Sequence, residues 1–255
     1  VEFGPQIFVQ EYLVDYFNEE FFEKDINEIV RIYKRMIKHT LFVDDVDTQH
    51  IEDLHALGYL PIEIKAVAEG TLVPLGTPLL TIENTHPKFF WLTNFLETMM
   101  SAELWQPATA STIALEYKKI LTKYALETVG NTDHVQFQAH DFSFRGMQGV
   151  PGGTKSAMAH LTAFVGTDTV PAIEALERYY FANIEKELVG TSIPATEHSV
   201  MCAHGQDELA SFREFITETY RSGYVSIVSD TWDFWNVIGT VLPALKEDIM
   251  NRDGK

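Results

Sequence analysis

The chain has 255 residues, which is enough for one large domain or two smaller ones that bury a core. Its 37 Asp and Glu residues against 19 Lys and Arg give a net charge of −18. Such a surface repels nucleic-acid backbones and anionic lipids, so we expect neither nucleic acid nor a membrane as a partner. No apolar run is long enough to span a bilayer, and the first residues lack the features of a signal peptide. The single cysteine excludes a disulfide within the chain, and we therefore expect a cytoplasmic protein.

Residues 1–130 predict a mixed α/β domain. Apolar residues recur at helical spacing in several segments, whereas Ile62 and Ile64 alternate with charged residues as in a strand. Glycine and proline residues then break that segment into short pieces. In chain order we expect helices at 25–38 and 48–58, a small antiparallel sheet within 61–83, and long helices at 88–104 and 109–128.

Residues 131–255 have a different rhythm, in which short apolar stretches alternate with helical patterns. Such alternation predicts parallel βα units, as in an α/β barrel or a doubly wound sheet. The expected strand segments are HVQFQAHDF (134–142), AHLTAFVGTD (159–168), ELVGTSIPATEH (187–198) and YVSIVSD (224–230). The expected helices between and after them are 169–180, 206–221 and 233–245.

Each of these expected strands ends in polar residues. The carboxyl ends of parallel strands share one face of the fold, and active sites form there. The sequence therefore predicts that four polar strand ends converge on one pocket. They carry His140, Asp141 and Arg145; Thr167 and Asp168; Glu197 and His198; and Ser229, Asp230 and Asp233.

The segment GVPGGTKS (149–156) nearly matches the phosphate-binding loop of nucleoside triphosphatases. Thr154 replaces the second required glycine, so backbone amides cannot wrap a phosphate in the usual way. We instead expect a flexible glycine-rich loop beside a pocket, where Lys155 is able to meet an anion.

The segment SIPATEHSVMCAHG (192–205) concentrates groups that bind metals or act as nucleophiles, namely Glu197, His198, Cys202 and His204. Their spacing matches no zinc motif, so we expect no metal site here and interpret Cys202 as a small buried thiol. His198 is either a structural histidine or an active-site residue, and Asp230 ends the next strand, where its carboxylate can orient the imidazole.

Two further residues allow a structural and a functional interpretation. Asp168 precedes a predicted helix and is a candidate for its N-terminal cap, as well as for a ligand contact. Phe142 is by default a core residue, but beside Asp141 and Arg145 it is also placed to stack on an aromatic ligand.

Several motifs together resemble the nicotinamide phosphoribosyltransferase family. The motifs are HDFSFRG (140–146), GTDTV (166–170), PATEHSV (194–200), VSIVSDTWDFWN (225–236), LPIEIKAVAEGTLVPLGTPLLTIENT (60–85) and WLTNFLET (91–98). The family joins nicotinamide to phosphoribosyl pyrophosphate, giving nicotinamide mononucleotide and pyrophosphate. The resemblance implies a type II phosphoribosyltransferase fold, with residues 1–130 in the mixed α/β domain. It implies that residues 131–255 form the first part of an irregular parallel α/β barrel that carries the nicotinamide pocket.

The resemblance also implies roles for individual residues. Phe142 resembles the aromatic residue that stacks on the pyridine ring, and Asp168 the carboxylate that accepts a hydrogen bond from the carboxamide. Arg145 resembles a pocket residue that faces substrate and phosphate groups. His198 resembles the histidine that ATP can phosphorylate, and Asp230 its carboxylate partner. Mg²⁺ carried by the pyrophosphate substrate, ATP as an optional coupling substrate, and a homodimer with shared active sites are implied as well.

Three alternatives remain open. A nicotinate phosphoribosyltransferase would use the same chemistry on the acid, and a non-catalytic protein could keep only the nicotinamide pocket. A metal hydrolase centred on His198 and His204 is the third. Family members extend further at both ends, including a phosphate-binding segment, so we expect the 255-residue chain to be inactive by itself.

Overall fold

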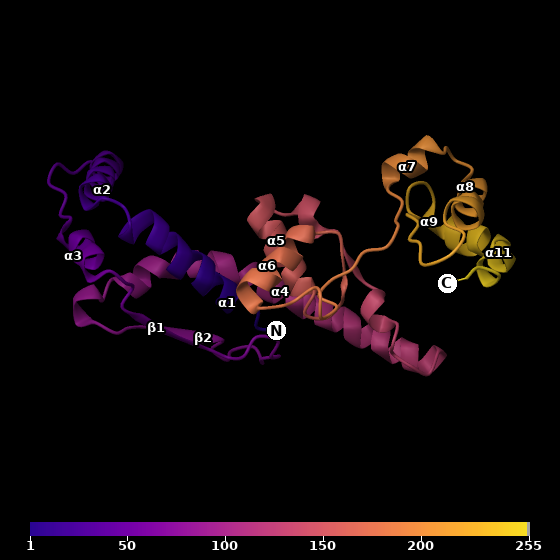
Figure 1. Ribbon diagram of the computed structural model, residues 1–255, viewed down its shortest axis with the longest axis horizontal. Coiled ribbons are helices and arrows are strands. Elements are labelled where there is room, and N and C mark those ends of the chain that lie inside the picture. The colour runs from indigo at the N-terminus through magenta and orange to yellow at the C-terminus, as the bar shows by residue number, and fades with distance from the viewer. Residues whose placement is uncertain (254–255) are drawn as a thin grey trace. The chain divides into compact units, whose positions relative to one another are not determined.

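The computed structural model describes residues 1–253 and shows two compact units, Val1–Thr191 and the unit that begins at Ser192 (Figure 1). Both units are rich in helix, and the two small sheets both lie in the first unit, so the fold is mixed α/β. Within the described residues, no helix combines the length and the apolar character that crossing a membrane requires.

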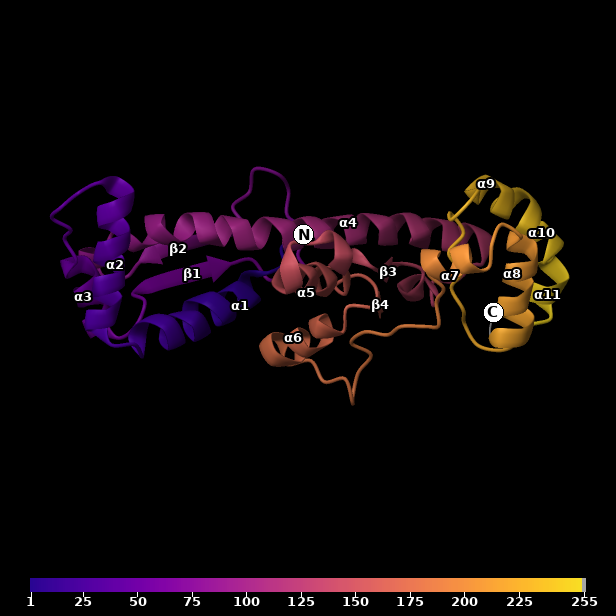
Figure 2. The same ribbon diagram turned by 90° about the horizontal axis from the view of Figure 1, so that it is seen from above.

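The first unit is built along one long helix, α4, which α1, β2 and α5 contact (Figure 2). In chain order its elements are α1 (Pro5–Phe8) with π-helical continuations Val9–Tyr16 and Asn18–Phe22, α2 (Ile26–Leu41), α3 (Gln49–Leu57), β1 (Ile62–Ala66), β2 (Leu80–Asn84), a 3₁₀ turn Pro87–Phe89, α4 (Leu92–Thr128), a 3₁₀ turn Val135–Phe137, β3 (His140–Asp141), a 3₁₀ turn Ser143–Gly146, α5 (Gly149–His160), β4 (Gly166–Thr167) and α6 (Val170–Tyr180).

The predicted N-terminal helices and sheet are confirmed. Asp25 caps α2 by accepting from the backbone N–H groups of Asn27 and Glu28, and Gly58 ends α3 with a φ of 80°, which favours glycine. Strands β1 and β2 pair antiparallel, with Ile64 opposite Ile82. Because both isoleucines pack on one apolar cluster with buried residues of α1 and α4, the sheet is attached to the helices through a shared core.

Pro107 does not divide the helix that follows the sheet. We predicted separate helices at 88–104 and 109–128, and this is wrong, because α4 runs without a break from Leu92 to Thr128. A proline inside a helix costs about 3 kcal/mol through the lost hydrogen bond and the steric conflict. Here the buried Pro107 ring lies against Gly4, where an added Cβ would come within 3.1 Å of Pro107 Cγ. The helix thus continues through Pro107, whose ring is buried against Gly4 at the start of the chain.

The glycine-rich segment 149–156 is also different from our prediction, because it forms the first turns of α5 and not a loop. Its glycine at 153 permits close packing: an added Cβ there would lie 2.6 Å from the Phe144 ring. Lys155 is buried and ion-paired with Glu103 and, at 2.8 Å, with Glu11. Burial lowers the pKa of Lys155, but hydrogen bonds to the two carboxylates outweigh burial and the pKa is raised. The anion that Lys155 meets is thus supplied by the protein's own carboxylates.

Parallel pairing follows α4, but it is much shorter than we predicted. Within the predicted strand segments 134–142 and 159–168, only two-residue strands form, and the segments 187–198 and 224–230 take part only in isolated bridges. Strand β3 pairs with β4 in parallel, with His140 opposite Gly166 and Asp141 opposite Thr167. A parallel bridge from Gly166 to Thr191 adds a third segment on the other side of β4. This pairing sets which side chains meet at the strand ends.

The second unit is a small helical cluster with two parallel bridges between loop segments, Ala195 with Ser226 and Ser222 with Asp253. The predicted helices at 206–221 and 233–245 are confirmed as helical stretches. The elements are α7 (His198–Ala203), α8 (Glu208–Glu214) continued by π-helical Phe215–Thr219, α9 (Phe234–Asn236), π-helical Val237–Val241, α10 (Leu242–Ala244) and α11 (Lys246–Met250). The core of this unit comprises Met201, Phe212, Phe215, Ile216, Val237, Val241 and Leu245.

Candidate functional site

Asp141 holds the ends of β3 and β4 together in the first unit. Its side chain is buried, and Oδ2 accepts hydrogen bonds from the hydroxyls of Thr169 at 2.8 Å and Thr167 at 3.2 Å. Its Oδ1 accepts from the backbone N–H of Ser143 at 3.2 Å. A buried carboxylate needs such partners, because an unpaired one would be strongly destabilising. Asp141 therefore stabilises the two strand ends through hydrogen bonds to Thr167 and to residues that follow the strands.

Asp168 lies beside His140 at this edge. His140 Nε2 is 2.8 Å from Asp168 Oδ1, and the backbone N–H of Asp168 donates to the carbonyl of Asp141 at 3.2 Å. The capping interpretation of Asp168 is not supported, since Thr169 occupies the N-cap position of α6. The carboxylate is instead directed toward the neighbouring strand end.

Phe142 follows β3 and stacks on the imidazole of His140, with ring centroids 4.7 Å apart and planes inclined by 30°. The Phe142 side chain is 52% exposed, so it is not a core residue. Arg145, in the 3₁₀ turn that follows, is also exposed. The strand ends thus bring an accessible aromatic ring and a carboxylate to the same histidine.

A cavity of about 710 Å³ in the first unit adjoins these strand ends. His140, Asp141, Ser156 and His160 line it together with a largely apolar face of α4. Burial lowers the pKa of His160, although the nearby Asp141 carboxylate opposes this effect. Phe142, Arg145 and Asp168, all among the described residues, are not part of its lining.

The second unit holds the other predicted pair. His198 is the first residue of α7, and its Nε2 lies 3.1 Å from Asp230 Oδ1. The parallel contact aligns the two segments, because Thr196 N donates to the carbonyl of Ser226 at 3.0 Å and Thr196 Oγ1 accepts from Val228 N at 3.0 Å. Both side chains of the pair are about two-thirds exposed, at 63% and 67%.

The remaining polar residues of segment 192–205 have local partners. The His204 ring contacts Phe215 in a tilted arrangement, with centroids 4.9 Å apart, and its Nδ1 lies 2.9 Å from the carbonyl of Val200. Cys202 is exposed, so the prediction of a buried thiol is wrong: it lies on the outer side of the short helix α7. Within residues 1–253, no three or more His, Cys, Asp or Glu side chains are grouped so that they could hold a metal ion.

Comparisons with known proteins agree with the motifs. Residues 137–255 match the model of the nicotinate phosphoribosyltransferase (NAPRTase) family. A nicotinamide phosphoribosyltransferase of Acinetobacter baylyi is 51% identical over 253 residues, which cover 99% of this chain and 50% of that protein. Proteins of the same name from Mycoplasma genitalium and Xanthomonas campestris are 37% and 35% identical over 80% and 71% of the chain, and over 44% and 38% of their own lengths.

From residue 137 onward the chain is thus similar to the nicotinate phosphoribosyltransferase family, and along almost its whole length it is similar to proteins named nicotinamide phosphoribosyltransferase. The resemblance predicted from the motifs is confirmed, and the family match includes every predicted site residue, from Phe142 to Asp230. The chain spans about half the length of the curated relatives it matches, or somewhat less.

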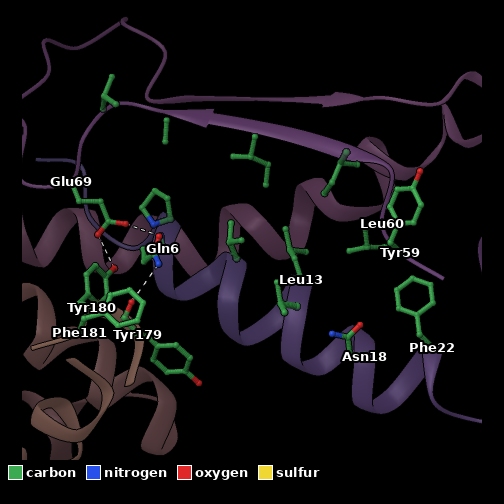
Figure 3. A pocket seen from close by; sticks show the side chains of 17 residues that line it. Gln6, Leu13, Asn18, Phe22, Tyr59, Leu60, Glu69, Tyr179, Tyr180 and Phe181 are labelled. Carbon is green, nitrogen blue, oxygen red and sulfur yellow. Dashed lines mark hydrogen bonds between the residues drawn. The ribbon is translucent and has the colours of Figure 1, made fainter. Parts of the chain in front are cut away.

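A second cavity in the first unit, of about 920 Å³, lies between α1 with its π-helical continuation and the sheet of β1 and β2. Figure 3 shows Glu69 directed toward Gln6 and Tyr180 at one end, whereas Tyr59 and Phe22 lie at the other. The Glu69 carboxylate accepts from Gln6 N at 2.7 Å and from the Tyr180 hydroxyl at 2.7 Å. The Glu69 carboxylate is thus already bonded to other groups of the protein. None of the site residues predicted from the sequence lines this cavity.

Sequence reasoning did not single out His140 and Gly166, which the structure brings into contact. His140 was noted only as one of several polar strand ends. The register of two parallel strands depends on both strands together. No single sequence segment therefore predicts that position 140 pairs with position 166.

Proposed function

We propose that the protein containing this chain transfers a phosphoribosyl group from phosphoribosyl pyrophosphate to nicotinamide. The pyridine nitrogen of nicotinamide attacks the anomeric carbon of the ribose, and the bond from that carbon to pyrophosphate breaks. Nicotinamide mononucleotide and pyrophosphate are the products. The observation that carries this proposal is the 51% identity to a nicotinamide phosphoribosyltransferase along 99% of the chain.

The geometry of the first unit supports the amide as the substrate. Phe142 offers an exposed ring for stacking, and the Asp168 carboxylate lies near it through their common neighbour, His140. A carboxylate accepts hydrogen bonds from a carboxamide NH₂ and repels the carboxylate of nicotinate. The proposed nicotinamide site therefore comprises Phe142 and Asp168, with Arg145 facing the ribose and phosphate side.

His198 and Asp230 are proposed to act on the pyrophosphate side. An exposed imidazole held at one nitrogen by a carboxylate keeps its ring orientation while its other face remains accessible to solvent and phosphate. In the resembling family this histidine accepts a phosphoryl group from ATP, so ATP belongs to the proposal as an optional coupling substrate. A phosphorylated His198 would help to order the phosphate groups by charge and hydrogen bonding.

Mg²⁺ enters the proposal as part of the pyrophosphate substrate. It prefers oxygen ligands and is often bound through one or two carboxylates together with substrate phosphates. The partly exposed carboxylates of Asp168 and Asp230 are of this type. Bound to the substrate, Mg²⁺ would neutralise charge on the leaving pyrophosphate.

The larger architecture is proposed on the same resemblance. The parallel pairing of β3, β4 and the segment at Thr191 is of the kind that a type II phosphoribosyltransferase barrel would continue. We also propose a homodimer with shared active sites in the cytoplasm.

The test is an assay of the gene product that contains this chain. With nicotinamide, phosphoribosyl pyrophosphate and Mg²⁺, we expect nicotinamide mononucleotide and pyrophosphate in equal amounts, measured by liquid chromatography with mass detection. Nicotinate should react far more slowly. Equal or faster turnover of nicotinate would favour the nicotinate enzyme, and nicotinamide binding in calorimetry without product would favour a non-catalytic binding protein.

The Asp168→Asn variant tests the selectivity argument. Removing the negative charge should lower the ratio of nicotinamide to nicotinate kcat/KM by about tenfold or more, the scale of one hydrogen bond to a charged group. Glu174→Gln, an exchange of a carboxylate on α6, serves as the matched control and should leave the ratio unchanged. An unchanged ratio in Asp168→Asn would contradict the role given to this carboxylate.

A further inference from the structure

His140 is held on three sides at the end of β3. Its Nε2 lies 2.8 Å from Asp168 Oδ1, and its ring stacks on Phe142 at 4.7 Å. Its third contact is with Gly166 of β4, where an added Cβ would lie only 2.7 Å from His140 Nδ1. Glycine at position 166 thus leaves the space that the imidazole occupies, and the ring has little freedom to turn.

The strand register makes this arrangement a fixed one. His140 is directly opposite Gly166, and Asp168 follows β4 by one residue. The buried Asp141 ties the two strand ends together through the hydroxyls of Thr167 and Thr169. The distance from His140 to Asp168 is therefore set by backbone pairing and not by two flexible surface side chains.

The bond has a defined direction. An ionised carboxylate only accepts hydrogen bonds, so the proton of this contact is on His140 Nε2. A donor at Oδ1 restricts rotation of the carboxylate, and the stacked imidazole restricts the Phe142 ring. Restricting groups before a ligand arrives reduces the entropy lost on binding.

We propose that His140 is a positioning residue for a pyridine carboxamide, because it orients the Asp168 carboxylate by a hydrogen bond and the Phe142 ring by stacking. This inference rests on the proposed function. It assigns His140 no contact with the reacting atoms. Its effect is on the affinity for nicotinamide and on the preference for the amide over the acid.

Two pairs of variants separate the contributions of His140. His140→Phe keeps a ring against Phe142 and removes the donor, whereas His140→Gln keeps an N–H donor at a similar reach and removes the aromatic ring. In the gene product that contains this chain, we expect His140→Phe to raise the KM for nicotinamide by about tenfold, the scale of one charge-assisted hydrogen bond. The KM for phosphoribosyl pyrophosphate should stay within about twofold, as expected when only the ring site is affected. The second pair compares His140→Asn with His140→Gln. The shorter amide of His140→Asn does not reach Asp168, so its KM for nicotinamide should rise as in His140→Phe. The KM of His140→Gln should be closer to that of the wild type.

A double-mutant cycle distinguishes positioning from a structural role. If His140 acts through Asp168, His140→Phe should change the nicotinamide KM by less than about twofold in an Asp168→Asn background. Additive effects of the two substitutions would overturn the proposal, and so would equal losses in His140→Gln and His140→Asn. A wild-type protein that turns over nicotinamide while every His140 variant matches it would overturn this inference alone. A wild-type protein with neither turnover nor nicotinamide binding would overturn the proposed function as well.

Discussion

His140 with Asp168 in the first unit and His198 with Asp230 in the second are both histidine–aspartate pairs beside parallel backbone pairing. The first pair is 2.8 Å apart, with side chains 21% and 45% exposed. The second pair is 3.1 Å apart, and its side chains are 63% and 67% exposed. The same two side-chain types are thus paired once in a partly buried environment and once largely exposed to solvent.

The difference shows which pair is built into the fold. Around the first pair, the structure supplies a stacked ring, a glycine that makes room, and the buried Asp141 beneath. The second pair is aligned by backbone contacts of Thr196 and is otherwise open to solvent. A packed pair suits the recognition of one fixed ligand shape, and an open pair suits a group that must accept and release phosphate.

The largest effect in this comparison should come from Asp141→Ala. This substitution removes the acceptor of the Thr167 and Thr169 hydroxyls and of the Ser143 amide, and leaves these donors without their carboxylate. We expect a loss of about 2–3 kcal/mol in the free energy of unfolding, the scale for a buried polar network that loses one partner. Urea unfolding, with amide hydrogen exchange of Thr167 as a local probe, measures this loss in the 255-residue chain.

Asp141→Asn is the graded control, because an amide keeps one oxygen acceptor and should cost less than alanine. A change of under about 0.5 kcal/mol in Asp141→Ala would mean that the strand ends do not depend on this carboxylate, since that is the range of ordinary surface substitutions. The contrast between the two units would then lose its physical basis.

An intermediate effect should appear in the pH dependence of the first unit. Burial makes the pKa of His160 lower in the folded chain than in the unfolded chain, where a histidine titrates near 6.5. Below about pH 6.5 the unfolded chain then binds more protons, so this residue makes the free energy of unfolding fall as the pH falls. In His160→Gln, the loss of stability between pH 7.5 and 5.5 should be shallower than in the wild type. Urea unfolding at a series of pH values measures the slope, and an equal slope in both proteins would contradict the assigned effect of burial.

Local patterns in the sequence predicted the elements whose signals are local. The amphipathic segment of α2, the Gly58 stop of α3 and the alternation around Ile64 all reappear as expected. The family relationship was also accessible, because motifs such as HDFSFRG carry it in consecutive residues.

Features that depend on distant parts of the chain were not accessible. Pro107 lies within a continuous helix and packs against Gly4, and the glycine at 153 makes room for the Phe144 ring. The contact of His140 with Gly166 likewise depends on strand register. Tertiary packing overrides local propensity in each of these places, and no sequence window contains both partners.

The smallest effect on stability should come from Asp230→Asn in the second unit. A hydrogen-bonded pair with both side chains mostly in water contributes about 0–1 kcal/mol, because solvent screens the attraction and ordering the side chains opposes it. We therefore expect the free energy of unfolding to change by less than about 0.5 kcal/mol, with His198→Gln giving a similar result. If the proposed function holds, the same two variants should nevertheless lower the ATP-coupled rate of nicotinamide mononucleotide formation, since the orientation of His198 matters there and not in folding. A large loss of stability in either variant would show that the second pair, like the first, is part of the packed structure, and the distinction between the two pairs would fail.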